Sequence, residues 1–248
     1  MLLYGPVESR RWLLGAAIGW GALAASSLVL GALLGLARTW PAWQVGIVLA
    51  FGAGALISAV SFDLVEEGAA IGEPGTVGIG LAVGALTYYG LNRVVERRTS
   101  HGAAGQGENA GPALALGAFL DGIPEQTVLG IGLATGEGVS VALLVAIFVS
   151  NVPEAIGSTT ELRASGTSEA TIRRLWVAVA AICTLASLAG YAAADSVSDD
   201  LKAVINGFAA GALLVMLVDS MIPDAARKGG RAAGLATVLG FAVAFGLA

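Results

Sequence analysis

The sequence has few charged residues, a single cysteine and a single histidine. Charged residues make up 12% of its 248 residues, about half the share in soluble domains. One cysteine, Cys183, forms no intrachain disulfide, and its apolar surroundings predict a small buried side chain. One histidine, His101, is too few for the paired histidines of a metallopeptidase motif, so we expect no enzyme.

The sequence also has no linker that would separate two domains, and no cluster of basic residues. The net charge is −5, and the basic residues are spread along the chain, which argues against a nucleic-acid partner. We therefore expect one domain over residues 1–248. Its most loop-like segment is the small, polar, glycine-rich stretch at about 97–111.

Apolar residues dominate instead, at 56% of the sequence. They form eight runs, each about long enough to cross about 30 Å of hydrocarbon as a helix. The runs lie at 12–36, 43–65, 74–95, 112–134, 138–162, 171–194, 203–224 and 231–247. The 36 glycines fall largely inside these runs, where small residues let helices approach closely. The sequence predicts an all-α, multi-pass protein of the cell membrane (inner or plasma), in contact with the lipid bilayer.

The basic residues predict how the chain is oriented. Ten of the 13 lie after odd-numbered spans, and three lie on the other side. Because basic loops stay in the cytoplasm, the loop at 97–111 is expected to be cytoplasmic and both termini to face outside. The ten are Arg38, Arg93, Arg97, Arg98, Arg163, Arg173, Arg174, Arg227, Lys228 and Arg231.

The second and seventh spans resemble each other. Phe-Gly-Ala-Gly-Ala-Leu at 51–56 matches Phe-Ala-Ala-Gly-Ala-Leu at 208–213. Each continues to acidic residues that could line an entrance or exit: Asp63, Glu66 and Glu67 in the first, Asp219 and Asp224 in the second. These spans run in opposite directions, which predicts inverted repeats in a 3+2+3 arrangement. The alternative is a chance similarity between two apolar helices, and the acidic ends weaken it.

The two central spans carry matching polar motifs. One reads Asp121-Gly-Ile-Pro124-Glu125, and the other reads Ser150-Asn151-Val-Pro153-Glu154. Residues four apart share a helix face, so Asp121 lies with Glu125 and Ser150 with Glu154.

Carboxylates within a membrane are costly and mark functional sites. Each proline also frees a backbone carbonyl one turn earlier. If the two spans pack together, Glu125 and Glu154 can share a divalent cation held by oxygen ligands. The alternatives are a pair that shares a proton, and prolines that serve only to bend the helices.

These motifs resemble those of the ZIP (Zrt-, Irt-like) family of metal transporters, in particular its short bacterial members. The family's fourth span reads His-Asn-x-Pro-Glu-Gly, where this chain has Asp121-Gly-Ile-Pro-Glu125-Gln. The fifth span carries variants such as Gln-Asn-x-Pro-Glu, against Ser150-Asn151-Val-Pro-Glu154 here. The resemblance implies a permease that moves divalent metal toward the cytoplasm. It implies metal ligands at Asp121, Glu125, Ser150, Asn151 and Glu154.

The departures from the family pattern bear on the metal and on activity. Without the family's histidine, the ligands are oxygens, which shifts the relative preference toward manganese or iron(II). Zinc and cadmium stay open as transported substrates, and no cofactor is expected. The alternative function is a transport-inactive sensor or scaffold that has lost the histidine ligand. A homodimer is common for such folds and is a further expectation about partners.

Overall fold

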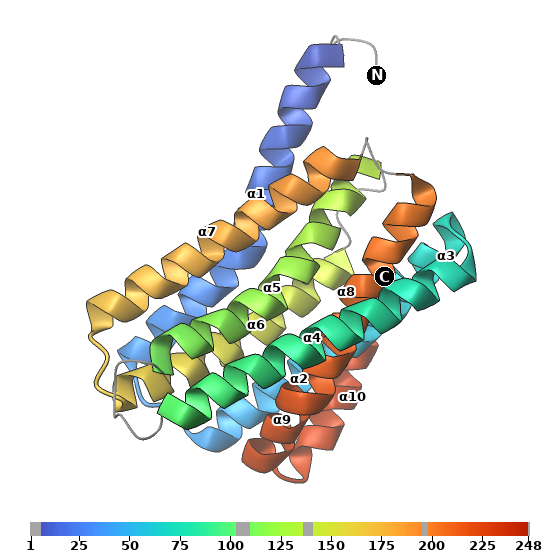
Figure 1. Ribbon diagram of the computed structural model, residues 1–248. Coiled ribbons are helices and arrows are strands. Elements are labelled where there is room, and N and C mark those ends of the chain that lie inside the picture. The colour runs from blue at the N-terminus through green and yellow to red at the C-terminus, as the bar shows by residue number, and fades with distance from the viewer. Residues whose placement is uncertain (1–5, 103–109, 136–140, 195–197, 248) are drawn as a thin grey trace.

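The fold is a bundle of helices that lie side by side (Figure 1). This computed structural model describes residues 6–102, 110–135, 141–194 and 198–247. Within those ranges, the side chains of 6–13, 74, 95, 96, 98–102, 110–121, 135, 142 and 161 are not described. The expectation of an all-helical fold is confirmed for the part of the chain that is described.

Two of the long helices contain a wider π-helical segment. The elements in chain order are α1 (Pro6–Ala37), α2 (Ala42–Ala59), η1 (Val60–Glu66), α3 (Glu67–Ile71), α4 (Pro74–Gly102), α5 (Ala110–Thr135), α6 (Val141–Ala164), α7 (Glu169–Ala194), α8 (Asp199–Met216), η2 (Leu217–Met221), α9 (Ile222–Gly229) and α10 (Ala232–Phe245). The π-helical segments are η1 and η2. Each continues without a break from the preceding α-helix into the following one, so 42–71 and 199–229 are two long helices.

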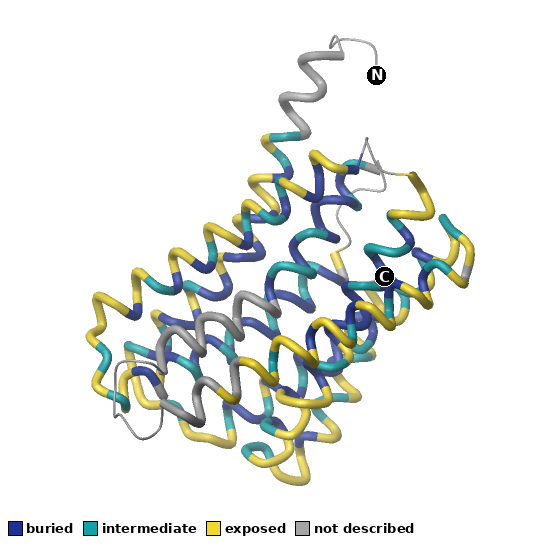
Figure 2. The backbone as a smooth tube through the Cα atoms, viewed as in Figure 1, coloured by how far each residue is buried: buried dark blue, intermediate teal, exposed yellow. Residues whose placement is uncertain are grey.

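Five helices are long and apolar enough to cross a membrane, among the residues described. They cover 14–37, 42–71, 143–164, 169–194 and 199–229. Helix α10 is apolar but shorter. Buried residues follow the inner sides of the helices, and exposed ones follow the outer sides (Figure 2). Many exposed residues are apolar, including Leu86, Leu235 and Val238, as expected for surfaces that face lipid. The prediction of eight spans is therefore supported for five of them.

The loop predicted at 97–111 is shorter in the structure, because both neighbouring helices extend into it. Helix α4 continues through His101 to Gly102, and α5 begins at Ala110. Residues 103–109 lie outside the described part of the chain. Adding a residue to an existing helix is far easier than starting one. A glycine costs only about 1 kcal/mol relative to alanine, so the polar, glycine-rich ends of this segment extend the neighbouring helices.

The helices pack in two groups. In the first group, α1 packs on α6 and α7, and α5 packs on α7. In the second group, α4 packs on α8, and α2 packs on α10 and α9. The main contact between the groups joins α2 to α6. Among the described residues, helices α5 and α6 touch only slightly, so the described parts of the two polar motifs are not carried on a tightly packed pair.

Two crossings in the second group use glycine in the same way. A side-chain carbon added at Gly54 of α2 would collide with the Thr237 carbonyl of α10. One added at Gly240 would collide with the Phe51 carbonyl. Helices α8 and α4 repeat this arrangement. In each of the four helices, the glycine comes three residues after the residue whose carbonyl meets the partner's glycine. Both pairs therefore pack backbone against backbone. The residues are Phe51, Gly54, Thr237 and Gly240 at one crossing, and Phe208, Gly211, Leu81 and Gly84 at the other.

The two π-helical segments occupy matching positions. Segment η1 begins at Val60, nine residues after Phe51, and η2 begins at Leu217, nine residues after Phe208. Segment η1 contains two of the predicted acidic residues, Asp63 and Glu66, and η2 contains one, Asp219. π-Helical segments often occur at functional sites. The resemblance between spans two and seven thus extends beyond the sequence match to local backbone geometry.

Candidate functional site

Both central prolines lie inside continuous helices, as the sequence predicts. Pro124 is within α5, and Pro153 is within α6. A proline in a helix interior removes one backbone hydrogen bond and leaves the carbonyl four residues earlier available. In α5 and α6 these carbonyls belong to Leu120 and Val149. Each proline therefore leaves one backbone acceptor in the middle of its helix without its usual helical donor.

Polar side chains next to these prolines are buried. Glu125 and Gln126 are each 1% exposed, Ser150 is 2% exposed, and Asn151 is 4% exposed. The Ser150 hydroxyl donates to the Ile147 carbonyl at 3.1 Å. Burying so many polar groups in an apolar bundle is costly unless they are hydrogen-bonded. Such a cluster therefore points to a function. The side chain of Asp121 lies outside the described residues.

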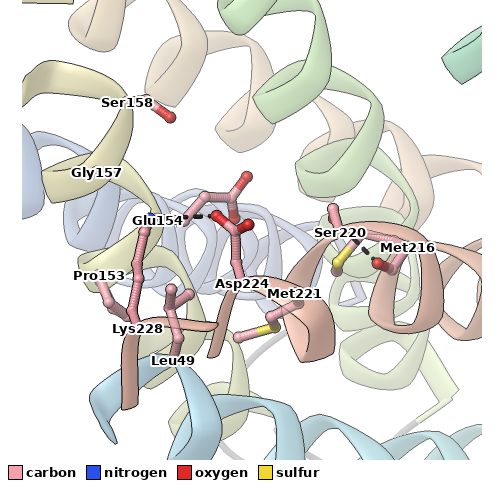
Figure 3. A pocket seen from close by; sticks show the side chains of 10 residues that line it. All are labelled: Leu49, Pro153, Glu154, Gly157, Ser158, Met216, Ser220, Met221, Asp224 and Lys228. Atoms are coloured by element: carbon pink, nitrogen blue, oxygen red, sulfur yellow. Dashed lines mark hydrogen bonds and ion pairs between the residues drawn. The ribbon is translucent and has the colours of Figure 1, made fainter. Parts of the chain in front are cut away.

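A cavity of about 200 Å³ lies where the two groups of helices meet (Figure 3). Glu154 of α6 contributes a carboxylate from the first group. Asp224 and Lys228 of α9 contribute a carboxylate and an ammonium from the second group, and all three side chains converge on this space (Figure 3). The lining residues are Leu49, Pro153, Glu154, Gly157, Ser158, Met216, Ser220, Met221, Asp224 and Lys228.

Asp224 forms ion pairs with two basic residues on its own helix. Lys228 Nζ lies 3.2 Å from one carboxylate oxygen, and Arg227 lies 2.6 Å from the other. The two basic side chains differ in position, since Arg227 is 71% exposed and Lys228 is 21% exposed. Arg227 thus neutralises Asp224 from the surface, whereas Lys228 lines the cavity.

Sequence reasoning used Lys228 only to orient the chain and missed its place beside Glu154. The available signal was its spacing of four residues from Asp224, which puts both on one helix face. That spacing could predict an ion pair within α9. It could not predict that this face turns toward α6.

The residues predicted to line an entrance or exit differ in how far they are buried and in whether they line the cavity. Of those in the first half of the chain, Asp63 and Glu67 are half-buried and Glu66 is exposed. In the second half, Asp219 is exposed. It is Asp224 that lines the cavity.

The described residues do not gather a complete set of metal ligands in one place. No three of their histidine, cysteine, aspartate and glutamate side chains are close enough together to hold a metal ion. Glu154 lines the cavity, whereas Glu125, Ser150 and Asn151 are buried elsewhere in the described bundle. The oxygen donors present suit hard or borderline divalent cations. The predicted five-residue ligand set includes Asp121 and stays a prediction.

Comparison with known proteins identifies the family. The model of the family described as "ZIP Zinc transporter" matches residues 95–248, which is more than half of the chain. The chain is also 30% identical over 197 residues to a protein of Arabidopsis thaliana described as a "Putative zinc transporter". That match covers 76% of this chain and 31% of the plant protein, so the chain spans about a third of its relative's length. With its apolar helices, this chain is a multi-pass membrane protein that belongs to the ZIP zinc transporter family.

Proposed function

We propose that this protein is a permease that moves a divalent metal cation across the membrane toward the cytoplasm. The observation that carries the proposal is the cavity between the two groups of helices, with the Glu154 carboxylate on one wall and Asp224 on the other. A carboxylate at such a boundary can bind a cation that becomes accessible when the groups move relative to each other. Family membership supports the same activity.

The proposed architecture has eight spans in a 3+2+3 arrangement of inverted repeats, with both termini outside. Matching glycine crossings and matching π-helical segments in the two halves support the repeats. The directions of the helices also agree with inverted repeats. Gly46 meets Gly229 while Gly52 meets Met221, so the helices at 42–71 and 199–229 run antiparallel. The bias of basic residues supports the orientation, and the plasma or inner membrane is the proposed location.

The proposed ligands are Asp121, Glu125, Ser150, Asn151 and Glu154. Three of them, Glu125, Ser150 and Asn151, are buried, and Glu154 is half-buried. All four lie close to a proline within a helix, and this supports the set, because such groups are stabilised by a cation that replaces lost hydration. The proposed ligands on α5 and those on α6 can bind the same ion only if the two helices come closer together than they are here. We therefore propose that metal binding draws the two polar motifs together. Zinc, iron(II), manganese and cadmium are the proposed substrates.

Uptake of metal into proteoliposomes tests this function. Purified protein should carry zinc or manganese inward down a concentration gradient. Glu154→Gln and Glu125→Gln keep the size of the side chain and remove the charge that offsets the cation, so both should abolish most uptake. Lys202→Gln is a matched control, because Lys202 pairs with Asp199 near the start of α8 and is not among the residues that line the cavity. Near-normal uptake by both glutamate variants would refute the site.

The alternative is a sensor or scaffold that does not transport. Asp121 in place of the family's histidine favours it, since one ligand has changed chemical type. The same proteoliposomes separate the two functions. A scaffold would bind metal, seen as a metal-dependent rise in thermal stability, and would show no uptake with any of the proposed metals.

A further inference from the structure

We propose that Lys228 is a tethered counter-ion that takes the place of the metal in the empty transporter. Its ammonium would neutralise the carboxylates of the cavity when no metal is bound, and would withdraw when metal enters. The inference rests on the proposed function and adds a mechanism for returning the empty carrier. Glu154 would then need no proton to balance its charge during that return.

The position of Lys228 supports this role. Its ammonium is 3.2 Å from Asp224 and enters the cavity that Glu154 lines from the opposite group (Figure 3). A side-chain carbon added at Gly157, three residues after Glu154, would be 3.9 Å from Lys228 Nζ. The ammonium therefore lies against the face of α6 that carries Glu154. It bridges the two groups of helices at the place where the cation is proposed to pass.

The backbone around Lys228 is held closely against α2. A side-chain carbon added at Gly46 would lie 2.7 Å from Lys228 Cβ and would collide with the Gly229 backbone. This close approach fixes where the lysine side chain begins. Its long, flexible chain can still move the ammonium in and out of the cavity.

The lysine is present in only one of the two matching halves. Aligning Phe51 with Phe208 places Glu67 at the position of Asp224, and Ile71 at the position of Lys228. Both halves thus carry a carboxylate at this point, and only one has a cation four residues later. A role in holding the repeat together would apply to both halves. A role in the transport cycle is needed in only one.

Charge balance explains what the lysine would do. Arg227 already pairs with Asp224 from the exposed side of α9. Lys228 therefore adds a second positive charge to the cavity, against the face of α6 that carries Glu154, where it can offset part of the cost of that carboxylate. A divalent metal held by Glu154 would repel the ammonium, because like charges in one small cavity destabilise each other. Metal and ammonium would occupy the cavity alternately.

Comparing two modes of zinc transport in Lys228→Ala tests the inference. Net uptake into zinc-free vesicles requires the empty carrier to return, whereas exchange of radioactive for unlabelled zinc does not. We expect net uptake to fall about tenfold or more, since the empty cavity would lose the cation that takes the place of the metal. Exchange should stay within about twofold of wild type, and zinc should bind more tightly because its internal competitor is gone.

Arg227→Ala is the matched control, since Arg227 pairs with the same aspartate without lining the cavity. It should leave the ratio of net uptake to exchange unchanged, and Lys228→Arg should largely restore that ratio. If Lys228→Ala weakens zinc binding and lowers both modes equally, or changes neither mode, the inference is wrong. If wild-type protein shows no zinc transport in either mode, the proposed function fails and the inference falls with it.

Discussion

Replacing glycine by alanine should have opposite effects at two nearby positions of α4, Gly80 and Gly78. A carbon added at Gly80 would collide with the Val204 carbonyl oxygen and would lie 2.9 Å from its carbon and 3.0 Å from Phe208 N. Carbon contacts are normally about 3.5 Å or longer. Gly80→Ala must therefore push α4 and α8 apart by roughly 0.5–1 Å, which forfeits about a quarter to a half of each direct contact. We expect a loss of about 1–3 kcal/mol.

Gly78 provides the control on the same helix. No atom of the described residues lies within 4 Å of a carbon added there, so Gly78→Ala should be neutral or stabilise by up to about 1 kcal/mol through helix propensity. Cys183 supplies the assay, because it is the chain's one cysteine and is fully buried. A thiol-reactive fluorophore reports unfolding when the cysteine becomes exposed during heating. Equal melting temperatures for the two variants would mean that α4 and α8 do not pack through Gly80.

Three further predictions concern the polar groups of the bundle. Asp121→His should raise the preference for zinc over manganese in competition uptake, because imidazole is a softer ligand than carboxylate; an unchanged ratio would remove Asp121 from the ligand set. Gln126→Leu should stabilise the protein by about 1–3 kcal/mol in the cysteine assay, because neither polar atom of the buried Gln126 amide has a hydrogen-bond partner among the described residues; a large loss of stability would show that this amide is paired. Lowering the pH should weaken metal binding, because carboxylate ligands must lose their protons to bind metal; calorimetry in buffers of different ionisation enthalpy would detect the released protons, and a heat independent of buffer would contradict the prediction.

The sequence determined where the helices form and which of their positions are chemically unusual. Apolar length fixes a spanning helix locally, and a proline or a glutamate in such a run is visible without any structure. The burial of Glu125, Ser150 and Asn151 and the positions of Pro124 and Pro153 within helices follow from this local information. The match between 51–56 and 208–213 also pointed to the pair of helices that share a π-helical segment.

Only the tertiary structure decided which helix packs on which and what each charged residue faces. Gly54 and Gly211 occur in similar sequences, but nothing near them indicates that their partners are Gly240 and Gly84. Partner choice depends on the fit between surfaces far apart in the chain, which no local pattern encodes. For the same reason, Lys228 counted in the sequence only as a marker of the cytoplasmic side. Its place beside Glu154 arises because close packing at Gly46 turns one face of α9 toward α6.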